Sequence, residues 1–208
     1  YKPHLKCCTF EPFIPNYLVG AILLESDDFE EKMRQFQDKS LLLPIGVVPK
    51  VEYQVAFNSR KPGEFGNRED WLCPYFKNDS CSQWIYRGPV CAGYFCRHIT
   101  GGKHFWANFV DYMTYVEMAM AEEALVQLGF SPRQMSDCLD YMNMKTALPP
   151  PGDLWQGYTP IELYLKSFRI VATMDQFLDQ FKEAMGETGR ELEAALIRSH
   201  PGKKKKKG

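Results

Sequence analysis

Four cysteines fall within one short stretch of this chain, at Cys73, Cys81, Cys91 and Cys96, with turn-forming prolines and glycines between them. Thiolate sulfur is a soft ligand that suits zinc and iron-sulfur clusters. Four thiolates on a turn-rich loop can converge on one ion or on the four corners of one cluster. The spacing therefore predicts a metal centre, with an iron-sulfur cluster as the first choice and zinc as the second.

Two further cysteines, Cys7 and Cys8, lie upstream of this stretch. Adjacent side chains diverge on an ordinary backbone, so we expect one of the two, by preference Cys8, to reach the same centre. His98 follows the last clustered cysteine and could complete a three-thiolate site or orient a ligand. Cys138 stands alone in a predicted helix, where we expect a core residue.

Arg87 precedes Cys91, where its guanidinium could offset the negative charge of a thiolate-bound cluster, receive an anionic substrate, or form an ordinary surface ion pair. Aromatic residues are dense between positions 71 and 106 and would keep water from the centre. Three functions follow from these residues. They are a metal-binding protein with a structural, redox or sensing role, a metal-dependent enzyme in which Arg87 or His98 contacts substrate, and a metal-free helical interaction protein.

The cysteine pattern resembles the CxxCxxCC-type cysteine-cluster family, described as zinc- or iron-chelating, over about residues 6–96. The motifs that carry the likeness are Cys7-Cys8, Cys73-Pro74-Tyr75-Phe76, Cys81, Arg87 and Cys91. The family's upstream Cys-x-x-Cys does not occur in this sequence. The resemblance implies a metal-binding role for these residues and, in some members, an attached enzymatic activity.

The composition argues against nucleic-acid-binding, membrane-spanning and secreted disulfide-rich proteins. The 208 residues suffice for one sizeable core, and 25 Lys and Arg against 26 Asp and Glu give none of the basic excess that nucleic-acid binding needs. No apolar run reaches the length of a membrane-spanning helix. The odd cysteine count and the lack of an apolar leader favour a cytoplasmic protein over a secreted disulfide framework. The expected partner is a metal ion or cluster, with a protein partner left open.

The elements that must position the cysteines are mostly helical. Apolar spacing predicts a helix from about 105 to 128, with Glu117, Glu122 and Glu123 on its solvated face. Capping patterns predict helix starts at Asp27, Ser131, Thr159 and Thr188. Apolar spacing continues the helix from Thr159 toward Gly186. Alternating apolar residues over 51–57 predict a half-buried strand.

The expected fold class is α+β and mainly helical, in a single metal-binding domain over residues 1–198. A loop-rich, cysteine-containing N-terminal half, about 1–104, packs on about four C-terminal helices within 105–198. The proline run at 149–151 is expected to be a stiff internal connector, and residues 199–208, with five consecutive lysines, a disordered basic tail.

Overall fold

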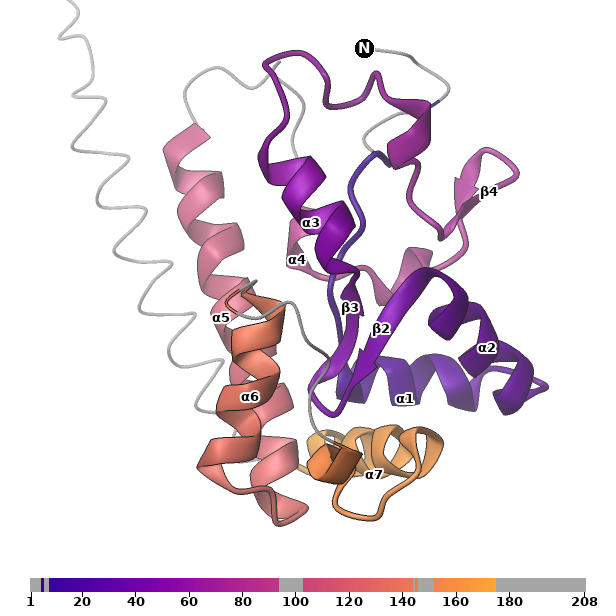
Figure 1. Cartoon of the computed structure of the whole chain (residues 1–208), viewed down its shortest axis with the longest axis vertical. Coiled ribbons are helices and arrows are strands. Elements are labelled where there is room, and N and C mark those ends of the chain that lie inside the picture. Colours follow the sequence, from indigo (N-terminus) through magenta and orange to yellow (C-terminus); the bar gives the residue numbers. More distant parts are fainter. Residues whose placement is uncertain (1–4, 6–7, 94–102, 144, 146–151, 175–208) are drawn as a thin grey trace, which may run out of the picture. The chain divides into compact units, whose positions relative to one another are not determined.

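The computed structural model describes residue 5 and residues 8–93, 103–143, 145 and 152–174 (Figure 1). The chain divides into two compact units, residues 1–172 and residues 173–208. The first unit combines seven α-helices with two small sheets among its described residues. The fold is therefore α+β and mainly helical, as the sequence predicts.

The N-terminal part of the first unit builds a three-stranded antiparallel sheet in the order β1-β3-β2. A two-residue turn joins β2 to β3, because Leu43 pairs with Gly46 across it. The elements here are β1 (Ile14–Pro15), α1 (Asn16–Leu24), α2 (Phe29–Lys39), β2 (Ser40–Leu43), β3 (Gly46–Pro49) and α3 (Val51–Asn58).

The rest of the unit holds a short hairpin and the longer helices. In chain order the elements are a 3-10 turn (Glu69–Trp71), β4 (Phe76–Lys77), β5 (Ser80–Cys81), a second 3-10 turn (Trp84–Tyr86), α4 (Pro89–Ala92), α5 (Lys103–Gln127), α6 (Pro132–Met142), a third 3-10 turn (Gly152–Trp155) and α7 (Pro160–Ala172).

Helix α1 packs along α7 and against the small sheet (Figure 1). The fully buried Tyr164 of α7 donates its hydroxyl hydrogen to the carbonyl oxygen of Leu43 at 2.8 Å, which ties α7 to β2. The contact between the helices is close at Gly20, where an added Cβ would lie 2.1 Å from the carbonyl oxygen of Tyr164. Only glycine allows the two helices to approach this far.

Asn16, at the start of α1, is a buried polar residue with all of its side-chain groups engaged. Its amide nitrogen donates to the carbonyls of Pro44, at 3.2 Å, and Ala121, at 3.0 Å. Its amide oxygen accepts from the backbone N–H of Tyr17 at 2.7 Å. These bonds link α1 to the β2–β3 turn and to α5. Because the amide is fully hydrogen-bonded, its burial costs little folding free energy.

The capping predictions are largely confirmed. Ser131 and Gln134 form a reciprocal capping box at the start of α6, and Thr159 Oγ1 accepts from the backbone N–H of Glu162 at 3.2 Å. Helix α2 begins one residue later than predicted, because Asp28 rather than Asp27 accepts from a backbone N–H, that of Glu31.

The predicted strand over 51–57 is wrong, because these residues form α3. When apolar residues occupy every second position of a short run, some of them are also four positions apart, and residues at that spacing share one face of a helix. Tyr53 and Phe57 form such a pair, and their rings stack with centroids 5.9 Å apart. Tyr53 also accepts from the backbone N–H of Glu11 at its hydroxyl, which draws this face inward.

Two further expectations differ from the structure. The loop-rich part is narrower than the N-terminal half, since three helices and a sheet precede residue 59. Helix α7 ends at Ala172, the next two residues are not helical, and the rest of the predicted helix, 175–186, lies outside the described residues. The proline connector, the helix expected after 187 and the lysine tail lie outside the described residues. No described helix is both long and apolar enough to cross a membrane.

Replacing Gly20 with Ala should lower the free energy of unfolding by about 2–3 kcal/mol or more, because the new Cβ meets backbone rather than a movable side chain. Chemical denaturation monitored by circular dichroism measures this loss. Tyr115→Ala, at a position 77% exposed on α5, is the control and should change stability by about 0.5 kcal/mol or less. Equal stability of Gly20→Ala and wild type would contradict the close helix contact.

Candidate metal centre

The cysteines come together from four separate segments of the chain. Cys8 precedes β1, Cys73 follows the first 3-10 turn, Cys81 ends β5 and Cys91 lies in α4. All four line one cavity of about 420 Å³. Cys73 is buried, whereas the other three are half-buried, and all four are free thiols.

A backbone hydrogen bond joins the N-terminal segment to the cysteine loop. The N–H of Cys73 donates to the carbonyl oxygen of Cys8 at 2.7 Å, and the N–H of Cys8 donates to Leu5 at 3.1 Å. These bonds fix Cys8 beside Cys73 although the two lie far apart in the sequence. Cys8 is therefore the described member of the Cys7–Cys8 pair that faces the cavity.

A tight turn and a hairpin place Cys73 and Cys81. Pro74 pre-sets the turn, which is closed by a bond from the N–H of Phe76 to the carbonyl of Cys73 at 2.9 Å. Asn78 and Asp79, with φ of 50° and 58°, then form the two-residue turn of the β4–β5 hairpin. The register pairs Phe76 with Cys81, so the hairpin returns the second cysteine toward the first.

The thiols influence one another electrostatically. Burial, and to a smaller extent the charges of Cys91, Cys8 and Cys81, raises the pKa of the Cys73 thiol to about 12. The backbone N–H of Tyr75 donates to the Cys73 sulfur and acts in the opposite direction. Buried thiolates that repel one another are stabilised when a cation lies between them, because the ion inverts the local electrostatics.

The four thiols line the same cavity, but the structure does not bring them close enough to bind one metal ion together. Among the described residues, no three His, Cys, Asp or Glu side chains are gathered closely enough to hold one metal ion. Two predicted ligands, Cys7 and Cys96, lie outside the described residues, as does the predicted cofactor contact His98. Cys138 is fully buried in the core and does not line the cavity, in agreement with its predicted role.

Arg87 lines the cavity and is held in place by Trp84. Its Nε donates to the carbonyl oxygen of Trp84 at 3.0 Å, and its guanidinium carbon lies 3.4 Å from the centroid of that indole ring. The stacking fixes the planar cation beside the thiols. Arg87 thus lines the same cavity as the four cysteines, and the indole ring under it is 63% exposed.

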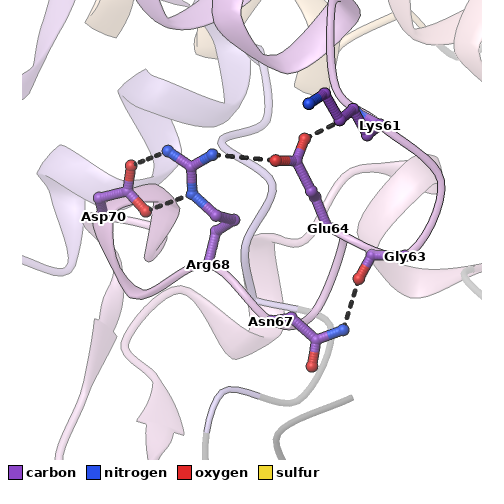
Figure 2. Close-up of polar contacts among 6 residues, drawn as sticks. All are labelled: Lys61, Gly63, Glu64, Asn67, Arg68 and Asp70. Carbon is purple, nitrogen blue, oxygen red and sulfur yellow. Dashed lines mark hydrogen bonds and ion pairs between the residues drawn. The ribbon is translucent and has the colours of Figure 1, made fainter.

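The loop over residues 61–70, which the sequence analysis missed, is held by a network of polar contacts (Figure 2). Arg68 bridges the carboxylates of Glu64 and Asp70, and its guanidinium also lies over the ring of Trp71. The backbone N–H of Gly66, in the same loop, donates to Thr9 Oγ1 at 2.8 Å, next to Cys8. These contacts hold the loop segment whose Phe65 lines the cavity.

Glu117 is buried, which corrects its predicted place on the solvated face of α5. Its carboxylate lies against Gly88, just before α4, where an added Cβ would be 3.0 Å from Oε1. Burial raises the pKa of Glu117 to about 7, and the charge of Glu117, after burial itself, raises the pKa of Tyr17. Glu117 is four and seven residues before the buried Ala121 and Ala124, a spacing that places all three on one helix face.

The raised pKa of Glu117 predicts a pH-dependent stability. The native state keeps the proton that the unfolded chain loses above the ordinary value of 4.5, so stability should fall as pH rises from about 4.5 through 7. The full penalty of a charged Glu117 is at most about 3 kcal/mol. Glu117→Gln should remove this loss, so wild type should weaken relative to the variant over that range in denaturation experiments. Parallel pH profiles for the two proteins would show that the carboxylate is not buried in this way.

Comparisons with known proteins give no relative for this geometry. No protein-family model matches the chain, and searches of curated proteins and of solved structures found no match either. The likeness to the cysteine-cluster family stays a prediction from the sequence.

Proposed function

We propose that this protein binds an iron-sulfur cluster, or zinc, through the thiolates of Cys8, Cys73, Cys81 and Cys91. The observation that supports this most strongly is that four cysteines from separate segments line one cavity. Buried free cysteines are common in protein cores, but Cys73 is close enough to the other three for their charges to alter its pKa. Cys7 and Cys96 remain candidate ligands from the sequence.

The chemistry of the donor set fits a thiophilic group. Zinc and iron-sulfur clusters both bind through thiolates, and hydrogen bonds to the sulfurs tune a cluster's potential. The Tyr75 N–H supplies such a bond to Cys73. Aromatic side chains around the cavity, among them Phe65, Tyr86 and Trp84, limit the access of water. When bound, the group would supply either folding free energy or electron transfer.

Metal binding requires the thiols to draw closer than they stand in the structure. The half-buried Cys81 and Cys91 are the ligands that can adjust, whereas Cys73 is buried and its backbone N–H is bonded to Cys8. A cavity of about 420 Å³ is more than one ion needs, and this favours a cluster over a single zinc. Arg87 then serves as the positive charge beside the thiolates, in keeping with its position in the cavity lining.

A second candidate function is a metal-dependent enzyme. The cavity volume falls within the range of small-molecule sites, roughly 300–1,000 Å³, and its lining combines an apolar wall with the polar groups of Asp79, Ser80 and Arg87. A catalytic centre keeps one coordination position open, whereas a structural centre is closed by protein ligands. Displacement of a metal-bound water by an added exogenous ligand, seen spectroscopically, would favour the enzyme.

Single replacements of Cys8, Cys73, Cys81 and Cys91 by Ala should each lower the bound metal to less than about a tenth of the wild-type amount, since each removes one ligand of the set. Protein purified under anaerobic conditions is examined by absorption spectroscopy and by metal and sulfide analysis. A brown cluster absorbs visible light, whereas zinc is colourless.

Cys138→Ala is the matched control, because it removes a thiol that is buried in the core but does not line the cavity. It should keep the wild-type metal content while losing stability through the small cavity it leaves. Wild-type protein with neither metal nor sulfide, or full metal content in the Cys73→Ala variant, would contradict the proposed function.

A further inference from the structure

A second hollow, of about 260 Å³, lies between α2 and the hairpin segment that carries Cys81. Lys32 and Lys39 of α2 and Lys77 of β4 line it, whereas Asp38 is the one carboxylate among its lining residues. Three ammonium groups against one carboxylate give the groove a positive charge. This excess is local, because the chain as a whole is nearly neutral.

Two of the lysines are held close together. Lys32 is half-buried, and burial followed by the charge of Lys77 lowers its pKa. In the part of the chain that the structure describes, neither ammonium group has a carboxylate within ion-pair distance. Like charges in a hollow repel, and an anion between them turns that repulsion into attraction.

A neutral side chain completes the groove. Gln83 lines it and is only 6% exposed. Its amide can donate to a ligand that accepts hydrogen bonds. The ring of Tyr75 also lines the groove, but its hydroxyl is enclosed beside Ser40, whose own hydroxyl donates to Glu11 at 2.6 Å.

We propose that this groove binds a phosphoryl group between Lys32 and Lys77, either as inorganic phosphate or as the phosphate ester of a small molecule. Lys39 supplies a third cation, and the side-chain amide of Gln83 supplies a neutral donor. Lysine binds phosphate as a point charge, and the groove is smaller than most sites for larger organic ligands. The site does not depend on the metal, although Tyr75 and Gln83 line both hollows.

Isothermal titration calorimetry of the full chain tests this site, with inorganic phosphate as the probe at fixed ionic strength. Wild type should bind one phosphate saturably, and Lys32→Gln and Lys77→Gln should each weaken binding about tenfold, because each removes a charged contact. Both side chains lie at the surface of the groove, so folding should persist, and circular dichroism checks this. The titration is then repeated with glycerol 1-phosphate. If the site is built for free phosphate, inorganic phosphate binds at least as tightly as glycerol 1-phosphate. If the site is built for a phosphate ester, glycerol 1-phosphate binds more tightly than inorganic phosphate.

Lys145→Gln is the matched control, because Lys145 is exposed and pairs with Asp140 away from the groove. Its phosphate affinity should stay within about twofold of wild type. Absence of saturable phosphate binding would overturn the proposal. Undiminished binding in the Lys32→Gln/Lys77→Gln double variant would also overturn it, since phosphate would then occupy another basic segment such as Lys203–Lys207.

Discussion

The hydrogen bond from the N–H of Cys73 to the carbonyl of Cys8 is the contact on which the candidate site depends. It joins a segment that precedes the first strand to a loop that follows the third helix. Without it, the cavity would lack one wall and one of its four thiols. Elsewhere in this unit, α1 is held by the hydrogen bonds of Asn16 and by its close contact with α7.

Opposing electrostatic effects act on the thiols of the cavity. Burial keeps the Cys73 thiol protonated, whereas metal binding needs thiolates, so affinity and protonation must be coupled. The Tyr75 N–H favours negative charge on the Cys73 sulfur. Glu117 differs from the thiols' surroundings, because burial beside Gly88 favours the protonated, uncharged form of its carboxyl group.

Much of the fold followed from local sequence signals. The capping box at Ser131 and the long helix α5 could be predicted because their stabilising contacts lie within a few residues. The strand predicted at 51–57 failed because a short alternating run also satisfies the four-residue spacing of a helix. Helix α1 escaped prediction because its apolar residues are continuous rather than periodic and are buried on most sides.

The residues of the candidate site could be predicted from the sequence, but the way in which they come together could not. Four of the six predicted cysteines line one cavity, since thiol chemistry can be read from residue type and spacing. The bond between Cys8 and Cys73 and the polar loop around Arg68 depend on contacts between distant or irregular segments, which carry no periodic signal. The burial of Glu117 did have a sequence signal, because its spacing from Ala121 and Ala124 places it on the same helix face as these buried residues. The prediction followed instead the general tendency of charged residues to be exposed.

X-ray absorption at the metal edge of protein purified without oxygen tests the central claim most directly, because it reports the atoms bound to the metal. If the thiols of this cavity bind an iron-sulfur cluster or zinc, the first shell consists mainly of sulfur, at about 2.3 Å for zinc. A first shell made only of oxygen and nitrogen would contradict the account.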